Sequence, residues 1–412
     1  MQKQNPQSIF NIVVFVAALG YFVDIYDLLL FTIVRKPSIL ALGVTDPTGI
    51  LSASTTIINL QMIGLLIGGI IWGMLGDKKG RLSVLFGSII LYSIANVFTG
   101  FAQNVDQYAW ARFAAGLGLA GELGAGITLV SELLPKNKRG IGTSFVAGIG
   151  LSGAVAAYLV FHFTKNWRTC YFIGGVLGFL LLVLRISVAE SGMFKDIKEK
   201  NVARGNFLMF FTSGYRFKKY LKAILIGLPT WFCVGILVNL SDKFATSLYG
   251  ANKIDSGAAI MFAYIAISLG DILIGFISQW MKSRKKPLYL FYCFTLISGI
   301  LFFSPLNNND TAMYWLCAAL GFSTGFWAIF VTMGAEQFGT NLRATAATTV
   351  PNMVRGLLPV MNLLFINLFQ HSWRWGMLKS AEYTGLIMLG IALTTAFFTE
   401  ETYGKDLNYI EQ

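Results

Sequence analysis

The sequence predicts an all-α membrane protein with twelve transmembrane helices, arranged as two pseudo-symmetric halves of six helices each. Hydrophobic residues make up 55% of the 412 residues and charged residues only 13%, whereas about 25% of the residues in soluble domains are charged. The chain contains many apolar runs of the roughly 20 residues that a spanning helix needs. In addition, short polar patterns of the first half of the chain recur in the second half.

Each predicted span is one apolar run between polar loops. The first run is too long for a cleavable signal peptide and is not followed by a small-residue cleavage site, so we expect it to remain as the first helix. The predicted spans are 9–34, 50–76, 82–102, 107–134, 140–163, 168–189, 219–247, 256–281, 287–306, 312–338, 343–370 and 377–399.

The distribution of basic residues predicts the orientation in the membrane. Alternate loops are rich in lysine and arginine, for example Lys78, Lys79 and Arg81 after the second span. Because cytoplasmic loops carry this excess, both termini are predicted to be cytoplasmic. The formal net charge of +12 therefore reflects topology, and we expect lipid rather than nucleic acid as the surrounding partner.

Repeated patterns divide the chain into two halves. Glu132 lies seven residues before Arg139, and 204 residues later Glu336 lies seven residues before Arg343. The predicted parts are an N-terminal half at 1–189, a cytoplasmic linker at 190–218 and a C-terminal half at 219–412. Parallel repeats with a binding site between them at mid-membrane are typical of transporters.

Several motifs resemble the major facilitator superfamily. The segment GMLGDKKGR at 73–81 is similar to that family's signature after the second helix, although Leu82 replaces the basic residue that usually follows. The segment RFAAGLGLAGELGAG at 112–126 resembles its fourth-helix pattern R-x-x-x-G-x-G. Together with the turn at 135–140, Trp167-Arg168 and AESGMF at 189–194, these motifs look most like the metabolite–proton symporter and sugar-porter branches. The second-half copy of the signature lacks an aspartate at the place of Asp77.

The resemblance implies that residues at the inner helix ends form a gate. In the family, the loop signature holds the outward-open state, so Gly73, Asp77 and Arg81 are expected to act in gating rather than in substrate contact. We also expect interdomain salt bridges that break when the inner side opens. The predicted residues are Glu132, Arg139, Glu336 and Arg343.

Two acids in the first span, Asp24 and Asp27, are candidates for proton coupling. A charge at the bilayer centre costs roughly 3 kcal/mol on insertion scales, and a spacing of three residues places both acids on one helical face. Asp27 lies about 10 Å below the outer end of its helix, and Arg112 of the fourth span lies about 8 Å below the outer end of its own, so the two are at similar depth. The resemblance implies a helix-1 acid paired with the helix-4 arginine, with Asp27 as the first proton carrier and Asp24 as the second. The alternative is a static ion pair that fixes helix packing.

Glu122 lies about 15 Å deeper than Arg112 on the same span. It resembles a glutamate that is common in the metabolite–proton branch. Two roles stay open at this stage: inward relay of the proton, or capping of polar groups within the N-terminal half.

Arg355 is predicted near the bilayer midplane, about 18 Å from the inner face. A lone cation there needs a partner. That partner is either a substrate anion or an internal acid, such as Asp271 or an acid of helix 1. The other predicted lining residues of a substrate cavity are Asn352, Trp231, Asn239, Tyr264 and Gln61.

These features together predict a secondary active transporter of a bacterial inner membrane, working as a monomer by alternating access. The expected activity is proton-coupled symport of a small organic anion, either a carboxylate or an aromatic acid. The alternatives are a proton symporter of a zwitterion or sugar, and a proton-antiport exporter of a siderophore or drug. The sequence shows no catalytic constellation of an enzyme, no metal-ligand spacing and no cofactor motif.

Overall fold

The computed structural model describes residues 12–79, 81–134, 138–189, 206–250 and 254–405. In this part of the chain every element is a helix. The N-terminal half contains α1 (Ile12–Ala41), α2 (Pro47–Lys79), α3 (Arg81–Gly100), α4 (Val105–Leu119), α5 (Glu122–Leu133), α6 (Arg139–Leu151), α7 (Gly153–Thr164) and α8 (Trp167–Ala189).

The C-terminal half begins with a 3₁₀ turn and includes two π-helical segments, η2 and η3. Its elements are η1 (Phe207–Phe210), α9 (Gly214–Ile226), α10 (Leu228–Phe232), η2 (Cys233–Val238), α11 (Ser241–Tyr249), α12 (Ser256–Trp280), α13 (Lys285–Phe303), α14 (Asp310–Ser323), α15 (Trp327–Glu336), α16 (Arg343–Gly356), α17 (Leu358–Asn362), η3 (Leu363–Ser372) and α18 (Met377–Phe397).

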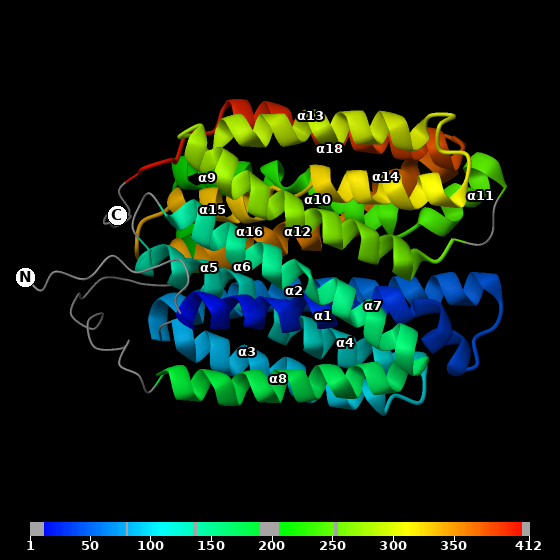
Figure 1. Cartoon of the computed structure of the whole chain (residues 1–412), viewed down its shortest axis with the longest axis horizontal. Coiled ribbons are helices and arrows are strands. Elements are labelled where there is room, and N and C mark those ends of the chain that lie inside the picture. The colour runs from blue at the N-terminus through cyan, green and yellow to red at the C-terminus, as the bar shows by residue number, and fades with distance from the viewer. Residues whose placement is uncertain (1–11, 80, 135–137, 190–205, 251–253, 406–412) are drawn as a thin grey trace, which may run out of the picture.

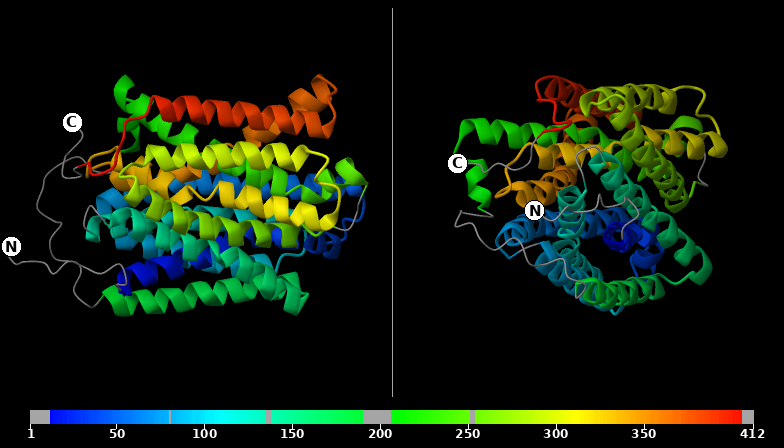
Figure 2. Two further views of the ribbon diagram at one scale, coloured as in Figure 1. Left: turned by 45° about the horizontal axis from the view of Figure 1, so that its top comes forward. Right: turned by 60° about the vertical axis from the view of Figure 1, so that its left-hand side comes forward.

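The helices form two bundles that lie against each other along their length. In Figure 1, α1 to α8 occupy the lower part and α9 to α18 the upper part, and the right-hand view of Figure 2 shows the same two groups from another side. The first described helix begins and the last one ends at the same end of the molecule (Figure 1). We call this the inner end, because it is the end that the sequence predicts to face the cytoplasm. The two-half, all-helical fold is as predicted.

Eleven helices of the described chain are long and apolar enough to cross a membrane. The predicted span at 107–134 is not among them, because it is divided into α4 and α5 at Ala120 and Gly121. This stretch is rich in glycine, which has poor helix propensity. The carbonyl of Ala120 accepts a hydrogen bond from the Asn352 side chain of α16, at 2.8 Å. The count of twelve continuous spans is therefore not reproduced.

The interface between the halves is formed mainly by α2 and α5 against α16, and by α6 against α12. Glycine permits the close approach. A Cβ atom at Gly124 of α5 would lie 2.4 Å from the Cα atom of Thr348 on α16. Nearer the inner end, Thr345 donates a hydrogen bond to the carbonyl of Gly73 at 3.1 Å. The inner parts of the two halves are thus packed backbone to backbone.

Candidate functional site

Arg112 of α4 and Asp27 of α1 form a fully buried ion pair. Arg112 Nη1 lies 2.9 Å from Asp27 Oδ1, and both side chains have 0% exposure. Arg112 also donates to the carbonyl of Asp27 at 3.1 Å and to the side chain of Asn96 at 2.8 Å. The pairing that was inferred from depth and from the family resemblance is thus present in the structure.

Polar side chains from neighbouring helices complete this first cluster. Gln61 of α2 donates to the carbonyl of Leu28 at 3.0 Å and accepts from Arg112 Nε at 3.4 Å. The guanidinium carbon of Arg112 lies 5.2 Å from the centre of the Tyr171 ring. Gln61 therefore belongs to the Arg112 cluster and not to a substrate cavity, which corrects its predicted place. The sequence analysis did not predict Asn96 and Tyr171 as members of this cluster. A polar side chain within an apolar span could have indicated them.

Glu122 is paired within its own half. At the start of α5 it accepts hydrogen bonds from both terminal nitrogens of Arg185 on α8, one of them at 3.0 Å. The pair lies directly against α1 at Gly20, where a Cβ atom would collide with both side chains. Of the two roles left open, the structure shows the local pairing, and a relay role for Glu122 stays a prediction.

Asp24 differs from these paired acids. It has 0% exposure, and neither carboxylate oxygen has a hydrogen-bond partner in the described part of the chain. Of the charged side chains around Asp24, Arg355 acts on it most strongly, followed by Glu122, Asp27 and Arg185. Asp24 is therefore within electrostatic reach of the C-terminal half through Arg355, whereas Asp27 is paired with Arg112 inside the N-terminal half.

A small closed cavity of about 20 Å³ lies between the two halves. Its walls come from α1 and α6 of one half and from α10, η2, α12, α15 and α16 of the other. The lining residues are Tyr21, Ile25, Leu151, Thr230, Trp231, Val234, Tyr264, Ile267, Trp327 and Arg355. All of them are buried, so this structure shows the site in a closed state.

Arg355 is the charged residue of this cavity. Its guanidinium carbon lies 5.5 Å from the ring centre of Trp327 and 5.9 Å from that of Trp231. Nη1 donates to Asn352 Oδ1 at 3.1 Å, while Nε has no partner. Among the described residues, no carboxylate lies within ion-pair distance of Arg355. The aromatic faces and the Asn352 amide hold the cation in place without neutralising it.

The other predicted lining residues are distributed differently. Trp231 and Tyr264 line the cavity as expected. Asn352 is not among the lining residues, but its side chain accepts a hydrogen bond from Arg355. Asn239 is not among the lining residues of this cavity either, and its amide donates to the carbonyl of Gly235 at 3.4 Å. A substrate contact by Asn239 stays a prediction. Tyr21 and Trp327 line the cavity but were not predicted, because their positions are ordinary aromatic positions in apolar runs.

Asp271 has a local structural contact. Its Oδ1 atom accepts the backbone N–H of Ala328 at 2.9 Å, at the beginning of α15. An acid near the first turn of a helix stabilises the exposed N–H groups there. Asp271 therefore anchors α12 to α15 and forms no ion pair with Arg355 in the described chain.

The inner gate differs in part from the prediction. Glu336 accepts hydrogen bonds from Arg284 at 3.1 Å and from Thr402 at 2.8 Å, both in its own half. The expected salt bridge from Glu336 to the other half is therefore wrong. Arg284 nevertheless reaches the boundary between the two halves, since a Cβ atom at Gly140 would lie 2.3 Å from its Nη1 atom.

Arg343 is buried at the first position of α16. The side chains of Asp77, Arg81, Glu132 and Arg139 lie outside the described residues.

The segment after α18 is bound to the turn before α13. Glu401 accepts hydrogen bonds from the Ser283 hydroxyl and from the backbone N–H groups of Arg284 and Lys285. Partial burial acts to raise the pKa of the Glu401 carboxyl, but these hydrogen bonds outweigh it and hold the pKa below its usual range. This contact ties the C-terminal segment to the residue that pairs with Glu336.

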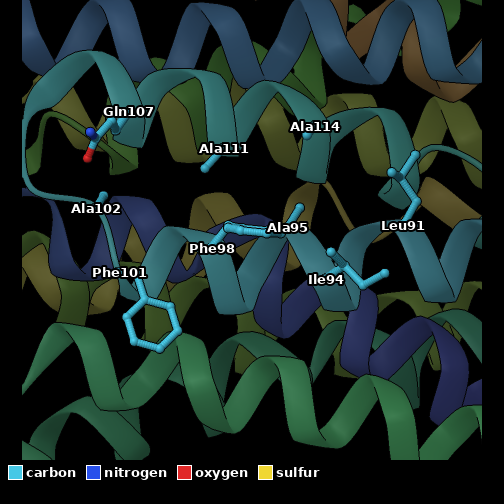
Figure 3. Close-up of a pocket in the computed structure, with 9 residues that line it drawn as sticks. All are labelled: Leu91, Ile94, Ala95, Phe98, Phe101, Ala102, Gln107, Ala111 and Ala114. Atoms are coloured by element: carbon cyan, nitrogen blue, oxygen red, sulfur yellow. The ribbon is translucent and has the colours of Figure 1, made fainter.

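A larger groove, of about 490 Å³, lies on the flank of the N-terminal half between α3 and α4. Figure 3 shows that its lining is almost entirely apolar, with Phe98 and Phe101 at its edge. Phe98 is 66% exposed and Phe101 is 61% exposed. Such a surface fits lipid chains, so we place the functional site at the smaller cavity, which contains the buried charge of Arg355. In the described ranges of the chain, no group of three His, Cys, Asp or Glu side chains could hold a metal ion.

Comparison with known proteins agrees with this geometry. A sequence profile of the Major Facilitator Superfamily matches residues 10–361. The chain belongs to the Major Facilitator Superfamily. It is a multi-pass membrane transporter and not an enzyme, as predicted.

Curated relatives of this major facilitator protein are bacterial transporters. A probable 4-methylmuconolactone transporter of Cupriavidus pinatubonensis is 28% identical, over 79% of this chain and 76% of the relative. The sialic acid transporter NanX of Escherichia coli is 28% identical, over 82% of both chains. The niacin transporter NiaP of Acinetobacter baylyi is 27% identical, over 86% of this chain and 87% of the relative. These relatives support a bacterial inner-membrane location.

A solved structure with the same fold is that of the proton:xylose symporter XylE bound to 6-bromo-6-deoxy-D-glucose. It superposes with a TM-score of 0.76 over 96% of this chain and 97% of XylE, at 16% sequence identity. At this identity the likeness shows the fold.

Proposed function

We propose that this transporter is a proton-coupled symporter of a small organic anion, which works by exposing the central cavity alternately to the two sides of the membrane. The observation that carries the proposal is Arg355, a cation with 2% exposure and no ion-paired carboxylate among the described residues. A buried charge without a partner is costly in a membrane. A substrate carboxylate bound in the cavity would supply the missing negative charge.

The remaining lining favours a planar organic acid. Trp231 and Trp327 place aromatic rings near the arginine, and Tyr21 and Tyr264 add two more aromatic side chains to the lining. Aromatic surfaces around a few fixed polar groups are typical of small-molecule sites. Relatives of this chain are named as transporters of niacin and sialic acid, and both compounds are carboxylic acids. These names support the substrate class without fixing the substrate.

The buried pair of Asp27 and Arg112 supports proton coupling. A carboxylate that is sealed from water and held by one arginine changes its proton affinity when the arginine moves. Motion of α1 relative to α4 during alternating access would provide such a change. We therefore assign proton exchange with the outer side to Asp27, with Arg112 as its controlling partner.

One observation favours a second candidate function. Arg355 is the strongest charge acting on Asp24, so an acid of helix 1 can serve as its internal partner. If that pair persists through the transport cycle, the substrate is a zwitterion or a sugar and not an anion. The two candidates predict different ligands and can be separated by a binding experiment.

The experiment is thermal stabilisation of the purified protein by nicotinate and by its neutral analogue nicotinamide. A ligand at 100 times its Kd stabilises the folded state by about 2.7 kcal/mol. We expect nicotinate to raise the melting temperature and nicotinamide to have little effect. Arg355→Gln should weaken nicotinate binding by about 3 kcal/mol, or roughly 100-fold, because a buried charge pair is lost.

Arg374→Gln is the matched control, because Arg374 is an exposed arginine in the loop before α18. It should leave the nicotinate shift unchanged. Stabilisation by sugars or zwitterions alone, across a panel that includes several carboxylates, would favour the second candidate. Equal loss of charged and neutral ligands in Arg355→Gln would assign Arg355 a structural role.

A further inference from the structure

Asp24 is a sealed acid whose two oxygen atoms make no hydrogen bond. Its neighbours on α1, Tyr21 and Ile25, both line the central cavity. Because residues three and four positions apart lie on one helical face, Asp24 belongs to the face of α1 that borders the cavity. Asp24 thus lies beside the central cavity that Arg355 lines.

The three arginines around Asp24 differ in whether they already pair with another carboxylate. Arg185 donates both terminal nitrogens to Glu122, and Arg112 is engaged by Asp27 and Asn96. Arg355 has no carboxylate partner in the described chain, and its Nε atom is free. Arg355 is therefore the cation that Asp24 can recruit when it is ionised.

The remaining titratable groups near Asp24 offer it no further free cation. Glu122 and Asp27 carry negative charge, each matched by its own arginine. Tyr21 of α1 and Tyr92 of α3 also lie within electrostatic reach of Asp24. Both are buried phenols whose hydroxyl groups lack a partner, and a phenol is neutral near pH 7.

We propose that Asp24 and the transported anion compete for Arg355, so that an anion enters the site only when Asp24 holds a proton. This inference rests on the proposed anion symport and explains how its two ligands are coupled. Arg355 offers one positive charge to two carboxylates. Placing both of them ionised in a closed cavity would leave one uncompensated buried charge, which costs several kcal/mol.

The exchange balances in charge and in atoms. In the empty carrier, the Asp24 carboxylate pairs with Arg355 and the site is neutral. One proton then adds to Asp24 and one carboxylate takes its place on Arg355, so the loaded site is also neutral. Among the described residues, Asp24 has no hydrogen-bond partner and no ion pair with Arg355, an arrangement that favours the neutral acid and corresponds to the step after the proton has bound and before the anion arrives.

Coupling through Asp24 is distinct from proton exchange at Asp27. Asp27 is held by Arg112 inside the N-terminal half and is not among the described residues that line the cavity. Asp24 lies three residues, or about 4.5 Å, nearer the inner end on the same helix. Protons that arrive from the outer side through Asp27 would therefore reach the substrate site at Asp24.

The first test measures proton uptake when nicotinate binds to the purified protein in weakly buffered solution. The wild type should take up about one proton per nicotinate bound, and its affinity should fall about tenfold per pH unit in the alkaline range, as linkage requires for one proton. Asp24→Asn should bind nicotinate without proton uptake and with an affinity independent of pH. Unchanged proton uptake in Asp24→Asn would overturn the proposal, as would its loss in Asp27→Asn alone.

Asp271→Asn is the control for this test. Asp271 is another fully buried acid with one unpartnered oxygen, and asparagine can still accept the N–H of Ala328 at the start of α15. Proton uptake on nicotinate binding should be unaffected by this change. Its loss would show that the measured proton does not belong to Asp24.

The second test needs no ligand and stands if nicotinate fails to bind. Infrared difference spectra between the wild type and Asp24→Asn identify the carbonyl band of the protonated Asp24 side chain. In Arg355→Gln this band should persist to more alkaline pH, because the competing cation is gone. An unchanged titration in Arg355→Gln would overturn the proposal. If this shift is found but no carboxylate binds at all, the anion symport fails while the link between Asp24 and Arg355 remains.

Discussion

Buried polar atoms without partners mark the chemistry of this transporter at the scale of single residues. Arg355 Nε, both oxygens of Asp24 and Trp327 Nε1 all lack a hydrogen bond, and all belong to the central cavity or its border. An unmade hydrogen bond in a buried site costs about 1–3 kcal/mol. A bound ligand that forms hydrogen bonds with these atoms would account for their missing partners.

Trp327→Phe tests this reading. The change keeps an aromatic ring beside Arg355 but removes the indole N–H. If that N–H donates to the bound carboxylate, affinity for nicotinate should fall by about 1.5–3 kcal/mol, which is at least tenfold. Trp315→Phe, at a position on α14 that is 69% exposed, should have no effect. Equal affinity in isothermal titration of both variants would mean that the N–H does not contact the ligand.

At the scale of elements, α5 and α16 pack closely across the interface between the halves, and we propose that this contact holds the inner side closed. The packing leaves no room for a side chain at Gly124, where a Cβ atom would lie 2.6 Å from the backbone nitrogen of Thr348. Asn352 reaches from α16 to the carbonyl freed at the break between α4 and α5, and it also holds Arg355. The α4–α5 break and Arg355 are thus linked through the amide of Asn352.

Gly124→Ala should shift the protein towards the inward-open state. Overpacking costs about 1–3 kcal/mol, so the closed population should fall by roughly 10- to 100-fold relative to the open one. A cysteine placed at the buried position Thr345 should then react faster with a maleimide reagent. Gly126→Ala is the control on the same helix, since its Cβ would meet only Ala17, at 3.8 Å. Equal labelling rates in the two variants would contradict the proposed gate.

Glu401→Gln tests the contact of the C-terminal segment. Because the folded pKa of Glu401 is depressed, its ionised form stabilises the fold above the ordinary glutamate pKa of about 4.3, and this contribution is lost as the pH falls through the folded pKa. The melting temperature of Glu401→Gln should therefore be lower than that of the wild type near pH 7, and the two should converge in acid. Glu400→Gln, at a side chain that is 62% exposed, should melt like the wild type throughout. A pH-independent difference would show that the charge of Glu401 is not responsible.

At the scale of the whole molecule, the proposed mechanism couples a proton site in one half to an anion site on the other. The closed cavity lies between the bundles, and contacts extend along the interface from Thr345 and Gly73 to Tyr158 and Asp255. Rocking of the halves about this cavity would break the contacts at one end of the interface while those at the other end persist. Proton-driven accumulation then requires Asp27 to exchange its proton in step with that motion.

Asp27→Asn should abolish accumulation of labelled nicotinate driven by a pH gradient in proteoliposomes, while exchange of internal and external nicotinate persists in part. The physical reason is that the side chain can no longer release a proton when Arg112 moves. Removing one partner of a buried ion pair costs about 3–5 kcal/mol, so the melting temperature must be checked. Asp106→Asn, at an exposed acid of α4, is the control. Undiminished accumulation by a folded Asp27→Asn variant would exclude the coupling role.

The sequence by itself determined the all-helical membrane class, the two-half organisation, and the prominence of Asp24, Asp27, Arg112 and Arg355, but not the division of the predicted span 107–134 into α4 and α5. It could do so because every charge in an apolar run is costly and stands out against its surroundings. The partnership of Asp27 with Arg112 also followed, since depth along two helices and a family motif agreed.

Only the tertiary structure decided the remaining partners. Glu122 pairs with Arg185, Glu336 pairs with Arg284, and Gln61 joins the Arg112 cluster instead of the cavity. Spacing along a helix fixes which residues share a face, but not how that helix is rotated or how closely it meets its neighbours. Packing of the two halves sets both quantities, and it is packing that places Tyr21 and Trp327 around Arg355 and leaves Asp24 facing the same cation.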